Sequence, residues 1–142
     1  MSDTVKPQTV ADKLNSAMIH LLRRASREDR ATGIGRAQLS ALSVLVFGGD
    51  TTLGGLADAE HVRPPTMTKI VSALEHGGLV RKEPSPHDRR SVRLSATPAG
   101  RRLMQAARRR RIEALAARLE GLSQRDLDTL DRAASLIEDA AG

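Results

Sequence analysis

Two short stretches of the sequence carry side chains that could bind a polyanion. The first lies in a predicted helix and contributes Arg63, Pro65, Thr66, Thr68, Lys69 and Ser72. The second lies in a predicted loop and contributes His87, Asp88, Arg89 and Arg90. Hydroxyl groups can bond to base edges or phosphates, and lysine or arginine can take a phosphate or a guanine. These residue types therefore predict contacts with nucleic acid.

The first stretch has residues that are typical of the start, the apolar face and the end of a short helix. Its apolar residues follow the i, i+3, i+4, i+7 spacing of one helix face: Met67, Ile70, Val71 and Leu74. Pro64 and Pro65 suit the first turn, and Gly77 suits a left-handed residue that ends the helix. The opposite face is small and polar, and could enter a major groove, which is about 12 Å wide. Since every surface helix has a polar outer face, an ordinary surface helix is the alternative.

The second stretch is the tip of a predicted hairpin. Residues 79–83 and 91–96 read as strands, the second with clean alternation, while Pro84 and Pro86 prevent regular pairing between them. An arginine at such a tip suits a narrow minor groove, where negative potential is concentrated. We expect Asp88 to hold the guanidinium of Arg90 by a bidentate pair, with an ordinary turn salt bridge as the alternative.

Helices are predicted for most of the remaining chain. The expected segments run from Thr9, with an N-terminal capping pattern, to about Arg30; over 39–46, closed by Gly48-Gly49; over 53–57, capped by Thr51 or Thr52; from Pro98 to about Gly121; and from Ser123 onwards. The order is four helices, a hairpin and two helices. The fold class is therefore mainly α with a small β-hairpin.

Positive charge is concentrated in the middle of the chain. The net charge is +6, but residues 61–111 carry 13 Lys/Arg against three acids, or +10, and the remaining 91 residues carry 10 against 14, or −4. A basic middle between acidic ends indicates a polyanionic partner, and nucleic acid is the common case. Charge that serves solubility alone is the alternative.

The amino-acid composition further limits the classes of protein to which the chain could belong. Phe47 is the single aromatic residue, so the core must be aliphatic and thin, which favours a partner subunit that buries more surface. The absence of cysteine excludes disulfides, thiolate chemistry and cysteine-ligated zinc. No apolar run approaches the roughly 20 residues that span a bilayer, and the first ten residues lack a signal-peptide core. We expect a cytoplasmic protein with no membrane partner.

With these motifs in place, the sequence resembles the MarR family of winged-helix bacterial transcription regulators over about residues 10–140. The resemblance is carried by residues 62–68 running into 74–80, and by residues 88–94 running into 97–100. In the family wing, an aspartate and an arginine two residues later occupy the positions of Asp88 and Arg90. The chain departs from the family at Arg63, where a small capping residue is usual, and at Gly54-Gly55, which replace helix formers.

The resemblance implies a homodimer that binds a pseudo-palindromic operator in double-stranded DNA. We expect a repressor, with an activator as the alternative. The resemblance also implies release by a small molecule, commonly an aromatic acid, at residues that the sequence does not identify. We expect one MarR-type domain over 1–142, with a winged helix-turn-helix over 36–100 and helical dimerisation segments over 9–31 and 98–141.

We expect the terminal helices to form the interface of a twofold-symmetric dimer. The alternative is that they form a helical bundle within one monomer. Arg108 to Arg111 span about 300° of helix circumference at 100° per residue, so they cannot all face one way. We expect most of them to be solvated or paired with Asp126, Asp128 or Asp131, and a flanking contact with DNA is the minor alternative.

Three other functions are less well supported. A hydrolase could use His87 and Asp88 with Ser85 or Ser91, but no nucleophile-elbow pattern is present. A metal- or ligand-sensing regulator with little operator specificity is an alternative, although the four histidines show no i, i+4 pair. A single-strand binder would need aromatic residues to stack on bases. We expect no catalytic residues, no metal ligands and no cofactor.

Overall fold

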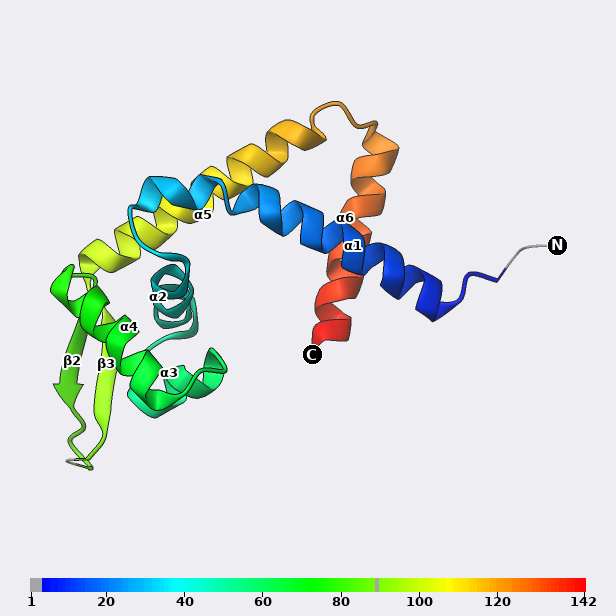
Figure 1. The fold of residues 1–142 in the computed structure, drawn as a ribbon. Coiled ribbons are helices and arrows are strands. Elements are labelled where there is room, and N and C mark those ends of the chain that lie inside the picture. The colour runs from blue at the N-terminus through cyan, green and yellow to red at the C-terminus, as the bar shows by residue number, and fades with distance from the viewer. Residues whose placement is uncertain (1–3, 89) are drawn as a thin grey trace.

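The computed structural model describes residues 4–88 and 90–142. In chain order the elements are α1 (Pro7–Ala25), the 3-10 helix η1 (Glu28–Thr32), α2 (Arg36–Gly48), β1 (Thr51–Thr52), α3 (Leu53–Ala59), α4 (Pro64–His76), β2 (Val80–Pro84), β3 (Val92–Ala96), α5 (Pro98–Leu119) and α6 (Gln124–Ala141). Figure 1 shows α2, α3, α4 and the sheet gathered at one end, which we call the head. Helix α5 leads away from the head, and α1 and α6 lie at the other end. The expected class, mainly α with a small hairpin, is confirmed.

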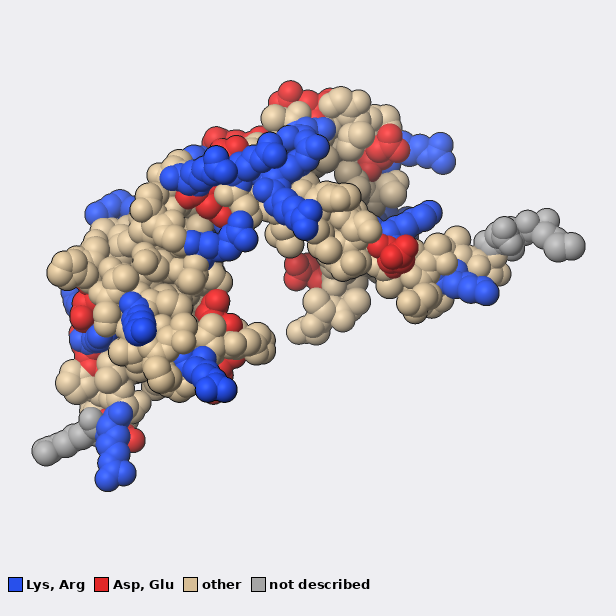
Figure 2. Space-filling view, in the orientation of Figure 1, with Lys and Arg blue, Asp and Glu red and all other residues tan. Residues whose placement is uncertain are grey.

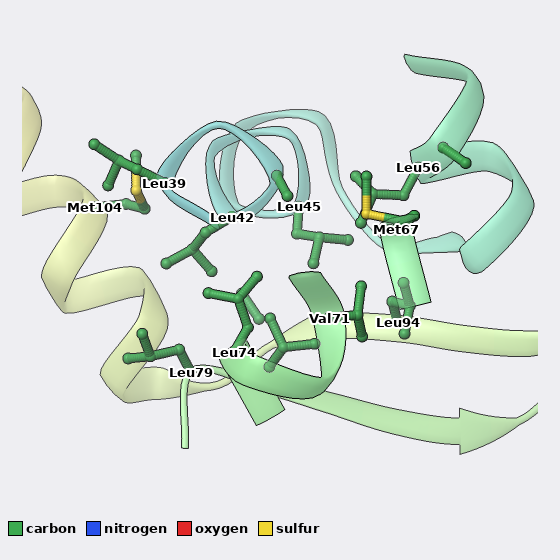
Figure 3. Close-up of a cluster of buried hydrophobic side chains, with 14 residues drawn as sticks. Leu39, Leu42, Leu45, Leu56, Met67, Val71, Leu74, Leu79, Leu94 and Met104 are labelled. Carbon is green, nitrogen blue, oxygen red and sulfur yellow. The ribbon is translucent and has the colours of Figure 1, made fainter. Parts of the chain in front are cut away.

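The head contains one aliphatic core. Its fully buried side chains come from α2, α3, α4 and β3: Leu42, Leu45, Leu56, Met67, Val71, Leu74 and Leu94 (Figure 3). The apolar stripe predicted for α4 therefore faces inward, with Ile70 partly buried beside it. Phe47 lies outside this core and is 56% exposed, so aliphatic and methionine side chains alone fill it.

The sheet has three strands rather than two. Strand β3 lies in the middle, with β2 and the short β1 antiparallel on either side. Thr51 pairs with Leu94 and Thr52 with Arg93, so the hairpin is tied to the segment that precedes α3. Two residues are too few to show alternation, which is why the sequence pattern did not reveal β1. The side chain of Thr52 then caps α3 by accepting a hydrogen bond from Gly55 N, as predicted.

Helix α5 begins tightly against the start of β2. The hydroxyl of Thr97 accepts from Gly100 N at 3.1 Å and donates to the carbonyl oxygen of Gly78 at 2.6 Å. A Cβ added to Gly100 would overlap the carbonyl oxygen of Leu79 and would lie 3.2 Å from a methyl of Leu42. Glycine at position 100 therefore allows the backbone of α5 to approach the end of α4 and the sheet.

Three helix boundaries differ from the sequence prediction. Helix α1 begins at Pro7 with Lys6 as its N-cap, so Thr9 is not a capping residue, and it ends at Ala25 before the separate turn η1. The left-handed residue after α4 is Gly78, with φ of 72°, and Gly77 keeps φ of −78°. In each case the boundary lies only a few residues away from the residue whose type suggested it.

Helices α1 and α6 pack differently from the head. Neither contains a buried residue, yet both carry large apolar side chains on the surface. Leu22 on α1 is 65% exposed and Leu136 on α6 is 64% exposed. This chain alone therefore leaves an apolar surface uncovered on its terminal helices.

The close approach at Gly100 gives a stability prediction. We expect Gly100→Ala to lower the free energy of unfolding by about 1–3 kcal/mol, because the new methyl meets backbone that cannot move aside. Urea denaturation followed by circular dichroism measures this change. Gly121→Ala is the matched control, since nothing among the described residues lies within 4 Å of its Cβ. Equal stability of the two variants would contradict the predicted clash.

Candidate nucleic-acid interface

The outer face of α4 is exposed and ordered. Pro65, Thr66, Thr68, Lys69 and Ser72 all lie on the solvent side of this helix, as predicted. The hydroxyl of Thr68 donates to the carbonyl oxygen of Pro64 at 3.0 Å. Since that proton is used within the helix, Thr68 presents an acceptor oxygen and a methyl group outward. No such bond within the helix is donated by Ser72 among the described residues, and Ser72 accepts a long contact of 3.5 Å from Lys82 Nζ.

The turn that precedes α4 is held from two sides. Val62 N donates to the carbonyl oxygen of Ala57 at 3.0 Å, which folds the chain back from α3. His61 in this turn adopts φ of 54°, an uncommon left-handed conformation for a residue other than glycine. The hydroxyl of Ser40 on α2 donates to Glu60 Oε2 at 2.7 Å. Together these contacts fix the direction in which α4 leaves the turn.

Helix α4 starts without a side-chain cap. Arg63 is its N-cap in extended conformation, and no side chain of the cap accepts a helix N–H. Pro64 and Pro65 then occupy the first two positions, where their missing N–H groups leave fewer donors unpaired. The departure noted in the sequence thus places a cation, rather than a hydroxyl or carboxylate, beside the start of α4.

The hairpin of β2 and β3 projects from the head beside α4. Figure 1 shows its tip extending beyond the helices. Ser85 N donates to Ser91 O at 2.9 Å and closes the base of the tip. Asp88 Oδ1 accepts from the backbone N–H of Arg90 at 2.9 Å. The predicted bidentate pair between Asp88 and the Arg90 guanidinium is absent from the described residues, so the prediction of that pair is wrong.

This difference at the tip has a physical cause. An aspartate two residues before an N–H readily closes an Asx turn, and that short bond leaves its carboxylate against backbone. Asp88 therefore orders the loop, while the side chain of Arg90 remains exposed. His87 is also exposed and makes no hydrogen bond with Ser85 or Ser91 among the described residues. Arg89, the fourth predicted residue of the tip, lies outside the described residues.

The cations of the head fall into two groups, and Figure 2 shows several of them on its surface. Three are balanced by acids on the same or neighbouring elements: Arg81 with Glu83 at 3.7 Å, Lys82 with Glu75 at 3.6 Å and Arg93 with Asp50 at 3.6 Å. Within residues 4–88 and 90–142, the cations of the head without an acidic partner within 4.0 Å are Arg36, Arg63, Lys69 and Arg90. The sequence did not separate these groups, since the acids come from three different segments. Of these unpaired cations, Arg63 and Lys69 belong to the start and the outer face of α4, and Arg90 lies at the tip of the hairpin.

Among the four consecutive arginines, Arg108 and Arg109 are exposed as expected, and only the partner of Arg111 differs from the prediction. Arg111 on α5 pairs with Asp29 of η1, 82 residues earlier in the chain, and not with the aspartates of α6. Helix α6 leads away from α5 after the turn that connects them, whereas η1 packs alongside α5 (Figure 1). No sequence pattern pointed to Asp29.

Among the residues that the structure describes, no three His, Cys, Asp or Glu side chains gather in a way that could hold a metal ion. No helix in this part of the chain has the length and apolar character that crossing a bilayer requires.

Comparisons with known proteins agree with this geometry. The model of the MarR family matches residues 34–92. The HTH-type transcriptional regulator MT0903.1 of Mycobacterium tuberculosis is 39% identical over 128 residues, which are 90% of each chain. A MarR family protein from Bacillus stearothermophilus has a solved structure with a TM-score of 0.83, 25% identity, and coverage of 97% of this chain and 99% of the other.

A third similarity is to the structure of NadR in complex with 4-hydroxyphenylacetate. Its TM-score is 0.66 at 23% identity, over 96% of this chain and 97% of NadR. At that identity the likeness concerns the fold alone.

The head, the turn before α4 and the projecting hairpin thus form a winged helix-turn-helix, and the relatives that share it are regulators and not enzymes. From the match in sequence over nine-tenths of its length and from this fold, the chain belongs to the MarR family of transcriptional regulators.

Proposed function

We propose that this regulator is a repressor that binds an inverted-repeat operator as a homodimer. The observation that carries this proposal is the small polar face of α4, with Arg63 and Lys69 on that helix and Arg90 at the hairpin tip, none of which has an acidic partner within 4.0 Å among the described residues. Helix α4 would enter the major groove, and Arg90 at the wing tip would reach the adjacent minor groove. Within this site, Thr66, Thr68 and Ser72 would contact base edges or phosphates. His87 and Arg89 would lie beside the sugar-phosphate backbone of the DNA.

The uncovered apolar surface of the terminal helices supports the dimer. Val10, Met18 and Leu22 on α1, and Leu130 and Leu136 on α6, are each at least 42% exposed. Large apolar side chains exposed on two helices of a protein that folds in water favour an interface there. We therefore assign residues 9–31 and 98–141 to dimerisation and residues 36–100 to DNA binding. A dimer of this kind would present two α4 helices about 34–36 Å apart, one turn of DNA.

A cleft between α1 and α5 supports release by a small organic acid. It has a volume of about 550 Å³, in the range of small-molecule sites. Leu21, Leu22, Ile112 and Leu115 provide apolar walls, and the charged residues are Arg24, Arg27, Glu28, Arg111 and Arg118. Guanidinium groups beside an apolar wall suit a carboxylate on an aromatic ring, the class of the NadR ligand. In the proposed dimer the partner would form the outer wall, because Leu21 and Leu22 belong both to the cleft and to the exposed apolar surface of α1.

The alternative is a ligand- or metal-sensing regulator with little operator specificity. The test is selection of bound duplexes from random-sequence DNA, followed by gel shifts at several salt concentrations. The proposal expects enrichment of an inverted repeat and a logarithmic affinity that falls steeply with salt. Enrichment of no repeat, with equal binding to any duplex, would favour the alternative.

Arg90 gives the first prediction for the interface. We expect Arg90→Ala to weaken binding to the selected repeat about tenfold or more and to lower the salt slope by about 0.9 for each phosphate that the protein no longer neutralises. Gel shifts at four salt concentrations measure both effects. Arg81→Ala is the control, because Arg81 is a similarly exposed arginine of the hairpin that pairs with Glu83. The role of Arg90 fails if both variants bind equally.

Leu22 gives a prediction for the dimer. We expect Leu22→Asp to convert the protein to monomers, because a carboxylate would be buried in the apolar interface. Light scattering should give the chain mass of 15.3 kDa instead of twice that mass. Ser16→Asp adds the same charge on the polar side of α1, away from its apolar stripe, and should leave the dimer intact. A Leu22→Asp dimer of unchanged stability would argue against this interface.

The cleft gives a prediction for release. Millimolar 4-hydroxyphenylacetate should weaken operator binding, and its uncharged amide should not, if the arginines hold the carboxylate. Arg118→Ala should reduce the response without changing operator affinity in the absence of the acid. Gel shifts across a titration of each compound measure this, and an equal response to acid and amide would exclude carboxylate recognition.

A further inference from the structure

Two segments of the chain connect the head to the terminal helices. One is α5, which is a continuous helix from the head to the turn that leads into α6 (Figure 1). The other is the stretch from the end of α1 through η1 to the start of α2 at Arg36. A head attached by one helix alone could twist or bend about that helix. The orientation of the head therefore depends on how the second connection is fixed to α5.

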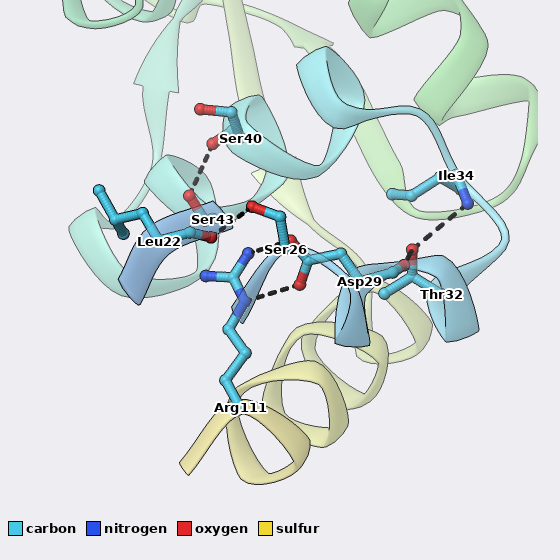
Figure 4. A network of polar contacts seen from close by, with 8 residues as sticks. All are labelled: Leu22, Ser26, Asp29, Thr32, Ile34, Ser40, Ser43 and Arg111. Atoms are coloured by element: carbon cyan, nitrogen blue, oxygen red, sulfur yellow. Dashed lines mark hydrogen bonds and ion pairs between the residues drawn. The ribbon is translucent and has the colours of Figure 1, made fainter. Parts of the chain in front are cut away.

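An ion pair between Asp29 and Arg111 joins these two connections. Arg111 Nε donates to Asp29 Oδ1 at 2.6 Å, and Nη2 donates to Oδ2 at 2.5 Å (Figure 4). This bidentate arrangement fixes the plane of the guanidinium as well as its distance. The side chain of Asp29 is only 18% exposed. Water therefore competes weakly for it, and the geometry is better defined than in a mobile surface pair.

The hydrogen bond that Arg111 donates to Asp29 also raises the pKa of Arg111, against the lowering effect of burial. A base whose pKa is higher in the folded state than in the unfolded state stabilises the fold at every pH below its pKa in the unfolded state. That contribution is lost only as the pH rises through its pKa in the folded state. Both limits lie far above neutrality, so the arginine keeps its charge under all ordinary conditions. The pair is thus a fixed link rather than a titrating one.

Hydrogen bonds in the residues after Asp29 connect the position of Asp29 to that of the head. The hydroxyl of Thr32 donates to the carbonyl oxygen of Asp29 at 2.6 Å, and Ile34 N donates to the Thr32 hydroxyl at 3.4 Å. Gly33 takes φ of 74°, which turns the chain toward α2. Ile34 then packs against the core of the head. Only a few hydrogen-bonded residues therefore separate the ion pair from that core.

Arg111 is placed too far along α5 to act as a DNA contact. It lies 13 residues after Pro98, which is about 20 Å along the helix at roughly 1.5 Å per residue. Figure 1 shows the wing tip at the opposite end of the head from α5. Any effect of Arg111 on operator binding must therefore be transmitted through the orientation of the head.

We propose that the Asp29–Arg111 ion pair is a positioning device that sets the separation and angle of the two DNA-binding heads. The inference rests on the proposed homodimer and its inverted-repeat operator. Two heads can bind one duplex together only when the distance between the heads matches the distance between the half-sites. Once one head is bound, the second then binds its half-site intramolecularly, which strengthens the complex. Without the pair, each head would keep its own fold and its DNA-contacting face, but the two heads would no longer favour one half-site spacing.

The experiment compares four proteins on a set of duplexes. The duplexes carry the inverted repeat selected by the wild-type protein, with its half-sites at the natural spacing or with one, two or three base pairs inserted or removed. A duplex with a single half-site completes the set. The proteins are the wild type, Asp29→Asn, Arg111→Ala and the charge-swapped double variant Asp29→Arg with Arg111→Asp.

Arg109→Ala is the matched control. It removes the same charge from the same helix two residues away, and Arg109 is exposed with no ion pair among the described residues. Thermal melting and light scattering of every variant show whether fold and oligomeric state are kept. Asp29→Asn, which preserves the shape of the side chain, keeps the test open if Arg111→Ala melts too low to use.

The proposal expects the single variants to bind about tenfold more weakly at the natural spacing, while single-half-site affinity changes less than twofold. Their preference for the natural spacing over the altered ones should flatten, and the charge swap should restore part of it. Arg109→Ala should behave as wild type. If the single variants keep the full spacing preference, the pair is not a positioning device, even if their melting temperatures fall. If the wild type itself shows no preference for a repeat, the proposed function has failed instead.

Discussion

The burial of Met67, Val71 and Leu74 under α4 is the interaction on which the DNA-binding surface depends. These side chains are fully buried against α2, α3 and the sheet, and each contributes roughly 1.5–3 kcal/mol by leaving water. With the inner face fixed in this way, the outer face can consist of small polar groups that contribute little to stability. The same helix therefore separates folding from recognition across its two sides.

Pairing of charges divides the head in a similar way. Lys82 and Arg93 are held by Glu75 and Asp50, acids from other segments that would otherwise add negative charge to the surface. Such exposed pairs contribute little to stability, typically about 0–1 kcal/mol, and their main effect here is on the electrostatic field. Among the described residues, Arg63, Lys69 and Arg90 carry charge that no acid within 4.0 Å balances, and it is available to phosphates. The carboxylate of Asp88 belongs to this division as well, because it bonds to backbone and leaves Arg90 exposed.

The terminal helices are stabilised in a different way from the head. The head closes its own core, whereas α1 and α6 contain no buried residue in the single chain. Their stability must depend on surface that this chain does not provide. The linker η1 lies between these two parts, and there a bidentate pair with α5 replaces the apolar packing that orders the head. Order in the linker thus rests on a few directional bonds rather than on burial.

What the sequence by itself determined is the local pattern. The 3.6-residue spacing placed the inner face of α4, proline and glycine marked its ends, and clean alternation marked β3, because these signals arise between residues a few positions apart. Only the tertiary structure decided the contacts between distant segments. The pairing of β1 with β3, the approach of Gly100 to Leu79, the choice of Asp29 as the partner of Arg111 and the sorting of paired from free cations among the described residues all join positions that no short-range pattern relates. Periodicity reports which side of an element is apolar, and folding alone decides which other element covers it.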